Sequence, residues 1–183
     1  MAEINEALVL VVDDNEMNRD MLSRRLERQG YRVLVAENGI RALEMMEAHN
    51  FDLVLLDIMM PKMNGYEVLE RVKADDHLRH IPVIMISAVD DLDSVVKCIE
   101  LGAEDYLFKP FNPVLLKARV GASLEKKRGR DLLNGALMGQ LRAPISAILQ
   151  KLEDLLEDSG LSPTQAEALK QIQIEANTLK ELL

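Results

Sequence analysis

Polar side chains directly follow four short apolar runs of this 183-residue sequence. Asp13 and Asp14 follow the first run, Asp57 the third, Ser87 the fourth and Lys109 the fifth. Two carboxylates about 4 Å apart repel each other by roughly 4 kcal/mol at an effective dielectric constant near 20. A divalent cation relieves this repulsion, and oxygen ligands favour Mg²⁺ over softer metals. The residue types therefore predict a Mg²⁺ site, provided that the fold brings them together.

Each of these residues has a use in phosphoryl chemistry. The Asp57 carboxylate can attack a phosphoryl group and form an acyl phosphate. Lys109 and the cation would neutralise the charge that develops on the transferred oxygens, and Ser87 would offer a hydroxyl to them. Taken singly, Asp13, Asp14 and Asp57 would be ordinary turn or capping residues. Their appearance together after the strands favours a catalytic site.

The apolar runs predict the elements that position these side chains. Each run is short, aliphatic and nearly continuous, as in strands covered on both faces. Amphipathic stretches separate them, and two of these stretches end at Gly30 and Gly102, where a helix commonly stops in a left-handed conformation. The alternation predicts a doubly wound α/β domain with a five-stranded parallel sheet in the order 2-1-3-4-5, in which strands 1, 3, 4 and 5 are neighbours and their polar ends converge. The predicted strands are 7–12, 31–36, 52–56, 82–86 and 105–108.

The helices of this domain are predicted from apolar spacing. Their expected apolar faces are Met21, Leu22 and Leu26; Ile40, Leu43 and Met46; Tyr66, Leu69 and Val72; and Leu92, Val95, Val96 and Ile99. Cys98, the single cysteine, lies among the last group, where a buried thiol is expected and no intrachain disulfide can form.

After Pro113 the sequence changes to a purely helical pattern with two heptad seams. The stretch "EDSGLSPTQ" (157–165) separates them, and there Ser162 can cap a new helix with Pro163 in its first turn. A helical hairpin is predicted, and two copies would bury both seams in a four-helix bundle. The alternative is that the hairpin packs on its own α/β domain. The seams are Leu141, Ile145, Ile148, Leu152 and Leu155, followed by Leu169, Ile172, Ala176, Leu179 and Leu183.

Composition restricts the classes of partner. The net charge of −9 argues against nucleic-acid binding. The basic run "EKKRGR" (125–130) is interpreted as a solvated linker face, with a docking patch as the alternative. The N-terminal "MAEINEALVLVV" has no basic region and too short an apolar run for a signal peptide or a membrane span. We expect a cytoplasmic protein without a membrane partner.

Residues 7 to about 124 resemble the receiver domain of two-component response regulators. The matching stretches are "VVDDNEMNR", "LVLLDIMMPKMNG", "IMISA" and "DYLFKPF". The resemblance implies phosphorylation of Asp57 by a histidine kinase or phosphotransfer protein. It also implies a Mg²⁺ ion held by Asp14, Asp57 and the Met59 carbonyl, with Asp13 assisting through water.

The same resemblance implies a switch and a backbone geometry. Ser87 and Tyr106 match the family's switch pair, in which the hydroxyl moves toward the phosphoryl group and the ring turns inward. The Lys109-Pro110 bond is expected to be cis. At two positions that tune hydrolysis of the acyl phosphate, this chain has Met59 and Ala88, which cannot orient a water molecule. We therefore expect a long-lived phosphorylated state.

The segment "MGQLRAPISAILQKLEDLLE" resembles the first helix of the dimerisation and phosphotransfer domain of histidine kinases, where the family pattern reads Ser-His-Glu-Leu-Arg-Thr-Pro-Leu. Leu141, Arg142, Pro144 and Ile145 match or nearly match. Gly139 stands at the histidine, Gln140 at the glutamate and Ala143 at the threonine. The three histidines of the chain, His49, His77 and His80, all precede this region, so histidine kinase activity is not expected. The alternative is a generic coiled-coil extension.

Two domains are expected, a receiver domain over 1–124 and a degenerate kinase-like hairpin over 125–183. The predicted function is that of a response regulator in which phosphorylation of Asp57 acts through a linker helix on a dimeric hairpin. We expect Pro144 to mark a flexible joint, and the hairpin to control protein interaction or a downstream effector. Beyond phosphorylation from a phosphodonor and autodephosphorylation, no enzymatic activity is expected.

The chain ends within a heptad at "LKELL", which suggests a fragment of a longer protein. The main alternative is that this chain is the regulatory N-terminal part of a larger signalling enzyme. The catalytic domain of that enzyme, such as a cyclase, phosphatase or kinase-like ATPase, would then follow Leu183. A DNA-binding regulator is a weaker alternative, because no helix-turn-helix pattern follows the receiver.

Overall fold

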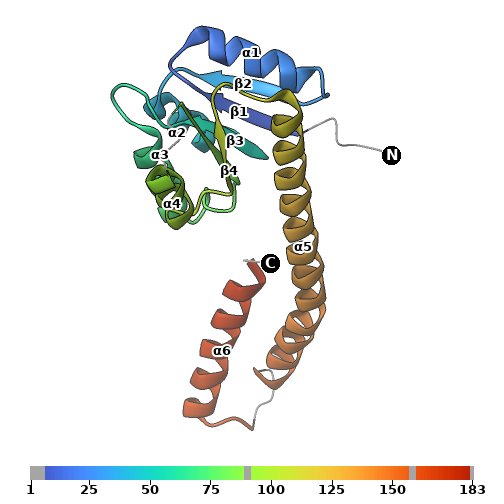
Figure 1. The fold of residues 1–183 in the computed structure, drawn as a ribbon. Coiled ribbons are helices and arrows are strands. Elements are labelled where there is room, and N and C mark those ends of the chain that lie inside the picture. The colour runs from blue at the N-terminus through green and yellow to red at the C-terminus, as the bar shows by residue number, and fades with distance from the viewer. Residues whose placement is uncertain (1–6, 89–91, 157–159, 182–183) are drawn as a thin grey trace. The chain divides into compact units, whose positions relative to one another are not determined.

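A five-stranded parallel sheet organises the first part of the chain (Figure 1). The computed structural model describes residues 7–88, 92–156 and 160–181. The strand order β2-β1-β3-β4-β5 is the predicted one, so the predicted fold class is confirmed. The elements are β1 (Leu8–Val12), α1 (Glu16–Glu27), β2 (Arg32–Ala36), α2 (Gly39–Ala48), β3 (Leu53–Asp57), α3 (Gly65–Ala74), β4 (Val83–Ser87), α4 (Leu92–Glu100), β5 (Asp105–Phe108), α5 (Pro113–Leu156) and α6 (Pro163–Glu181).

The register of the sheet brings the carboxyl ends of its central strands level. Val12 pairs with Leu56, Asp57 pairs with Ile86, and Ser87 pairs with Phe108. The residues that follow β1, β3, β4 and β5 therefore emerge at one edge. Both predicted helix stops are confirmed, because Gly30 and Gly102 have φ of 92° and 88°.

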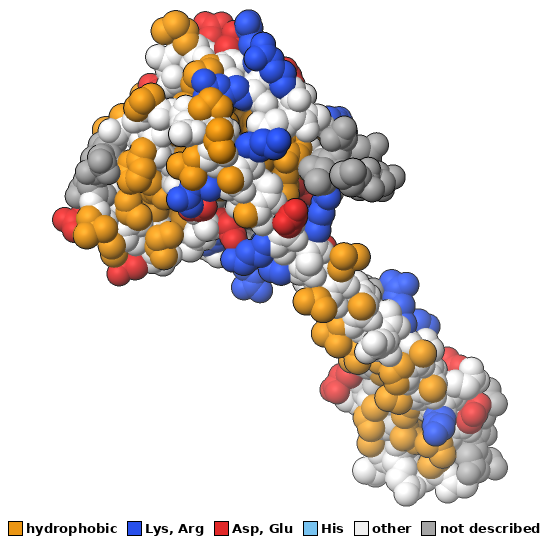
Figure 2. Space-filling model, turned by 45° about the vertical axis from the view of Figure 1, so that its right-hand side comes forward, with side chains coloured by type: hydrophobic (Ala, Val, Ile, Leu, Met, Phe, Trp, Pro, Cys, Tyr) orange, Lys and Arg blue, Asp and Glu red, His pale blue; other side chains and the backbone are white. Residues whose placement is uncertain are grey.

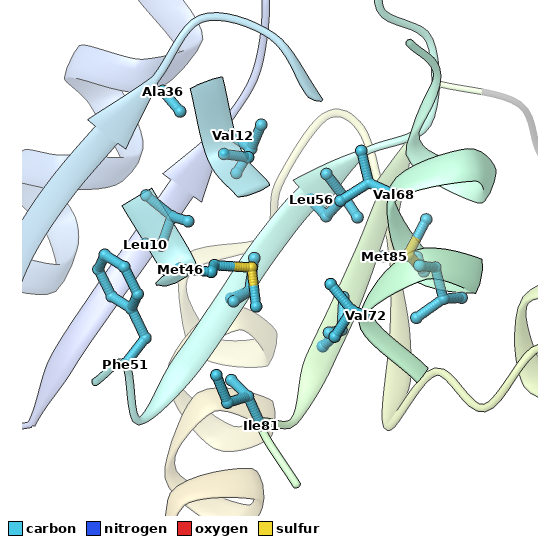
Figure 3. Close-up of a cluster of buried hydrophobic side chains, with 14 of the residues drawn as sticks. Leu10, Val12, Ala36, Met46, Phe51, Leu56, Val68, Val72, Ile81 and Met85 are labelled. Carbon is cyan, nitrogen blue, oxygen red and sulfur yellow. The ribbon is translucent and has the colours of Figure 1, made fainter. Parts of the chain in front are cut away.

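Two hydrophobic cores cover the two faces of the sheet. On one face, side chains of α2, α3 and α4 pack against alternate strand residues (Figure 3). Leu10, Val12 and Leu56 point into this layer, where they meet Met46 and Val68. On the other face, α1 and the first turns of α5 cover the intervening strand residues. A sheet covered on both faces explains why its strands are almost wholly apolar.

The predicted apolar faces of α2 and α4 were partly wrong. Ile40 is exposed, and Ala42 and Met45 face the core in its place. In α4, Leu92, Val96 and Ile99 are exposed, whereas Cys98 is buried as predicted. Burial raises the pKa of the Cys98 thiol. Periodicity locates a stripe on a helix, but the neighbouring elements decide which side of the helix meets the sheet.

The C-terminal region consists of helices. α5 runs unbroken through Pro144, although this residue has no amide to donate to Gln140. The predicted cap of α6 is confirmed. The Gln165 amide donates to the Ser162 hydroxyl at 3.3 Å, and the Ser162 amide donates to the Gln165 side chain at 2.9 Å.

The chain divides into two compact units, which we call the receiver unit, up to Arg128, and the helical unit, from Gly129. This division and the boundary predicted between residues 124 and 125 both fall within α5. Among the described helices, none is both long enough and apolar enough to cross a membrane.

Only part of the first predicted seam is buried in the helical unit. Ile145 and Leu152 are buried, together with Leu149, which was not part of the predicted seam. The other seam residues of α5 and the α6 residues Ile172 and Leu179 are exposed. Figure 2 shows hydrophobic side chains gathered in a stripe along one face of this unit. Leu183 lies outside the described residues.

Candidate functional site

The structure brings Asp13, Asp14 and Asp57 together at the carboxyl edge of the sheet. Asp13 and Asp57 are buried, and Asp14 is exposed. One carboxylate oxygen from each of the three residues lies within 4.8 Å of the others. Carboxylates this close repel one another unless a cation lies between or beside them.

Lys109 supplies one such cation. Its ammonium group donates hydrogen bonds to Asp57 Oδ2 at 2.7 Å and to Asp13 Oδ2 at 2.8 Å. The Lys109 amide donates to the Ser87 carbonyl at 2.7 Å, which places the lysine beside the end of β4. The peptide bond between Lys109 and Pro110 is cis, as the sequence resemblance implied.

Burial and the neighbouring charges shift both ionisable partners. Burial raises the pKa of Asp57, and the nearby charge of Asp13 adds to this rise, while Lys109 opposes it. Burial alone would lower the pKa of Lys109, but its hydrogen bonds to Asp13 and Asp57 outweigh this and raise it. Protons are thus held more tightly at Asp57 and at Lys109 than in the unfolded chain.

Two residues at the start of α1 hold Asp13, and the sequence reasoning assigned them no role. The Asn18 amide nitrogen donates to both Asp13 carboxylate oxygens, at 3.1 and 3.2 Å. The Arg19 guanidinium donates to the Asp13 and Asp14 carbonyls, at 2.8 and 3.0 Å. The Asn15 side chain caps α1. Their place in "VVDDNEMNR" was the signal, since all three lie within five residues of Asp14.

Gly65 lies close against the backbone of Asp57, and it too was missed. A Cβ atom at Gly65 would lie 2.3 Å from the Asp57 carbonyl oxygen. The Gly65 amide donates to the Ile58 carbonyl at 2.9 Å. On the other side of the loop, the Met59 amide donates to Asp57 Oδ1 at 3.4 Å. The backbone around the carboxylate is thus held at short range, and position 65 has no room for a side chain.

Ser87 and Tyr106 lie on the neighbouring strands β4 and β5. Ser87 is fully buried. The Tyr106 ring is buried in the core that α2, α3 and α4 form, and it meets the Phe108 ring edge-on with centroids 4.9 Å apart. The tyrosine is therefore in an inward position.

The donor set of the acidic cluster fits a hard divalent cation. Carboxylate oxygens from Asp13, Asp14 and Asp57 converge, and no sulfur or imidazole ligand joins them in the group. Oxygen donors of this kind suit Mg²⁺ rather than Zn²⁺ or copper. This site could bind Mg²⁺.

The kinase-like motif in α5 lies apart from any comparable cluster among the described residues. Gly139, Gln140, Arg142, Ala143 and Pro144 are all exposed. A Cβ atom at Gly139 would meet nothing within 4 Å. This region therefore provides no imidazole and no carboxylate pocket for phosphotransfer.

Fold and site together place the chain among doubly wound α/β domains with an acidic site at the carboxyl edge of the sheet. A model of the family described as "Response regulator receiver domain" matches residues 9–121, and the chain belongs to this family. The matched stretch includes Asp13, Asp57 and Lys109. It ends before the helical unit.

Solved structures and curated relatives agree with this assignment. The chemotaxis protein CheY4 of Vibrio cholerae is 31% identical, with a TM-score of 0.62 over 64% of this chain and 98% of that one. A probable cyclic di-GMP phosphodiesterase of Vibrio cholerae is 42% identical over 133 residues, which are 73% of this chain and 30% of that protein. The regulatory protein PhoP of Bacillus subtilis is 37% identical over 73% of this chain and 56% of that protein. The chain thus spans about half or less of the curated relatives that it matches.

Proposed function

We propose that this chain is a response regulator whose Asp57 accepts a phosphoryl group from a partner histidine kinase or phosphotransfer protein. The observation that carries the proposal is the contact of Lys109 with Asp57 and Asp13 at the edge where the three carboxylates converge. Membership of the receiver family supports the same assignment.

The residues have distinct roles in this reaction. A carboxylate oxygen of Asp57 forms the new bond to phosphorus while the bond from phosphorus to the donor nitrogen breaks, and the donor imidazole keeps the electron pair. The Lys109 ammonium group would contact the phosphoryl oxygens and neutralise their charge. Asn18 and Arg19 hold Asp13 and its backbone in place, which keeps the acidic cluster oriented.

Mg²⁺ would be held by Asp14, Asp57 and the Met59 carbonyl, with Asp13 assisting through water. When bound, it supplies positive charge that relieves the repulsion between the carboxylates and the incoming phosphoryl group. Asp13, which is buried and already paired with Lys109, contributes fixed negative charge that orients the lysine.

The change at Asp57 reaches α5 through β4 and β5. Ser87 would offer its hydroxyl to the phosphoryl oxygen, and the Tyr106 ring, which is buried on the neighbouring strand, would respond to this movement as its switch partner. Three ion pairs join α5 to the start of β5 and to the residues that directly precede β5 and β3: Arg119 to Asp105, Lys126 to Glu104 at 2.6 Å and Lys127 to Asp52 at 3.3 Å. Because these ion pairs hold α5, a displacement of β5 would move α5 with it.

Phosphorylation with a small donor tests the site. Purified protein is mixed with acetyl phosphate and Mg²⁺, and intact mass is measured. The expected result is the addition of one phosphoryl group, lost in Asp57→Asn and in the presence of EDTA. Asp76→Asn, which changes an exposed carboxylate, is the matched control. Labelling that persists in Asp57→Asn would show that another residue is the acceptor.

We expect the phosphorylated state to be long-lived. The exposed side chains of Met59 and Ala88 cannot form hydrogen bonds that would orient an attacking water molecule. Decay of the phosphoprotein, followed by intact mass after donor removal, should take far longer than seconds and should be faster in Met59→Asn. Decay within seconds in the unmodified protein would contradict this expectation.

We also propose that the helical unit forms a homodimer. Leu141, Ile148 and Leu155 recur every seven residues on α5 and are exposed, as are Ile172 and Leu179 at the same spacing on α6. Two such hairpins would bury these positions in a four-helix bundle. The degenerate motif then supports association without phosphotransfer, and phosphorylation in the receiver unit changes this association. A downstream effector would respond to it.

Sedimentation of the full chain tests this part. A dimer is expected at micromolar concentration, and Ile148→Lys should convert it to a monomer. Gln150→Lys places the same charge on a different face of α5 and is the matched control. Comparing mass with and without a beryllofluoride mimic of the acyl phosphate shows whether phosphorylation shifts the equilibrium. An unchanged monomer in both states would exclude the proposal.

The second candidate function is regulation of a larger signalling enzyme. It is favoured by the match to a probable cyclic di-GMP phosphodiesterase, whose aligned stretch of 133 residues makes up 30% of that protein. Reading the gene beyond the codon for Leu183 distinguishes the two candidates. A catalytic domain in the same reading frame would make this chain its regulatory part.

A further inference from the structure

A pocket of about 520 Å³ lies between the end of α1 and the first half of α5. We call it the α1–α5 pocket. Arg28, Gln29 and Tyr31 line it from the end of α1 and the segment that leads into β2, and Lys117, Leu124 and Arg128 line it from α5. Its size is in the range of sites that bind small molecules.

This pocket lies at the opposite edge of the sheet from Asp57. Tyr31 immediately precedes β2, so it marks the amino edge of the parallel strands. Asp57 ends β3 and marks the carboxyl edge. The pocket is therefore separate from the acidic site at Asp57.

Its lining is basic, although the chain as a whole carries a net charge of −9. Three basic residues, Arg28, Lys117 and Arg128, line it together with one acidic residue, Glu125. Neither Arg28 nor Lys117 forms an ion pair with any residue that the structure describes. Positive charges that are gathered in a concave site and outnumber the negative ones attract anions.

The rest of the lining offers apolar contact and hydrogen bonds. Tyr31 and Leu124 are both buried. Burial raises the pKa of the Tyr31 hydroxyl, which Arg128 opposes and Glu125 reinforces, so the hydroxyl is a neutral donor. Gln29 Oε1 is buried without a hydrogen-bond partner. A ligand that carries only charge would leave this part of the pocket unused.

We propose that the α1–α5 pocket binds a small soluble phosphate ester. Arg28, Lys117 and Arg128 surround the phosphate, and the organic part of the ligand lies against Tyr31 and Leu124. Three positive charges and one negative charge match a dianion better than a carboxylate, and guanidinium groups pair with phosphate through two parallel hydrogen bonds. The volume exceeds what inorganic phosphate alone would fill.

Titration of the ¹⁵N-labelled full chain tests the proposal, with EDTA present so that the acidic site stays free of metal. Adenosine 5′-monophosphate should shift the backbone amides of residues 28–31 and 117–128. Inorganic phosphate should shift the same amides more weakly, and adenosine should leave them unchanged. Arg28→Gln and Lys117→Gln should each weaken binding by about tenfold, the loss of one charge-assisted hydrogen bond. Arg41→Gln, on α2, is the matched control.

Three outcomes would overturn the proposal. One is the absence of shifts in both segments at millimolar adenosine 5′-monophosphate. Another is equal binding of adenosine, which would show that the phosphate is not recognised. The third is binding to vesicles of phosphatidic acid, but not of phosphatidylcholine, without any response to the soluble ester. That result would assign the basic lining to a lipid headgroup.

Discussion

The receiver unit and the helical unit bury their apolar side chains to very different extents. Leu10, Leu56 and Ile84 in the sheet are completely buried. In the helical unit, Ile145 is 6% exposed, whereas Ile148, one turn further along the same helix, is 50% exposed. Both units carry the apolar content of a folded protein, so the difference comes from how many faces each architecture can cover.

A doubly wound sheet closes both of its cores within one chain, because helices cover each face. A two-helix hairpin gives each helix a single neighbour, and an apolar stripe wider than that contact stays in solvent. The receiver unit therefore holds a complete site in one chain. The helical unit leaves part of its apolar stripe exposed.

Truncation of one apolar side chain in each unit should show the difference between the two units most clearly. Leu56→Ala should lower the free energy of unfolding of the receiver unit by about 3 kcal/mol, because it leaves a cavity in a closed core. Ile148→Ala should change the unfolding of the monomer by less than about 1 kcal/mol. All three tyrosines, Tyr31, Tyr66 and Tyr106, lie in the receiver unit and the chain has no tryptophan, so tyrosine fluorescence in urea reports the first effect. Far-ultraviolet circular dichroism follows the helices. Equal losses at the two positions would contradict the comparison.

Removal of the cation from the acidic edge should have the next largest effect. Lys109→Met leaves Asp13 and Asp57 buried together without their partner, which should destabilise the metal-free receiver unit by about 3 kcal/mol at neutral pH. Acidification should recover part of this loss, because protonation of either carboxylate removes the repulsion. Lys62→Met, at an exposed lysine, is the control. A variant as stable as the unmodified protein at neutral pH would show that the lysine is not needed to hold the pair.

Asp57→Asn should stabilise the metal-free protein by a smaller amount. Because the folded-state pKa of Asp57 is raised, the folded chain binds this proton more tightly than the unfolded chain. Stability is therefore lost as pH rises from 3.8 through the raised pKa, and the variant escapes that loss. Urea unfolding in EDTA at a series of pH values measures the free energy of unfolding of both proteins. The difference in favour of the variant should grow across this pH window and should persist at neutral pH. An unmodified protein that is the more stable of the two at neutral pH would refute the expectation.

The smallest expected effect is in the helical unit. Gly135→Ala should stabilise α5 by up to about 1 kcal/mol, since the added Cβ meets nothing within 4 Å and alanine favours the helix. Thermal unfolding by circular dichroism measures it. Gly65→Ala is the matched contrast in the receiver unit, where the added atom would lie 2.3 Å from the Asp57 carbonyl and should destabilise. If both substitutions stabilised the protein, or both destabilised it, the comparison between the two units would be contradicted.

Several parts of the fold and the site were predictable from short-range pattern. Runs such as "DLVLL" predicted β3 to within a residue, because a strand buried on both faces must be continuously apolar. Asp57 and Lys109 were predicted to meet because parallel strands end at one edge. Asn18, Arg19 and Gly65 were not assigned. The sequence places Asn18 and Arg19 near Asp13 but does not show which atoms they contact, and the approach of Gly65 to Asp57 depends on how the intervening loop folds.

The sequence by itself determined the alternation of strands and helices, the carboxylates at the sheet edge and the heptad stripes of the hairpin. These follow from local periodicity and from residue type. The tertiary structure decided which half of a stripe is covered, since Ile145 and Leu152 are buried while Ile148 is not. It also brought Arg28 and Lys117 into one pocket. The hydrophobic effect has no direction, so a sequence specifies that a stripe must be covered, and the packing of whole elements selects what covers it.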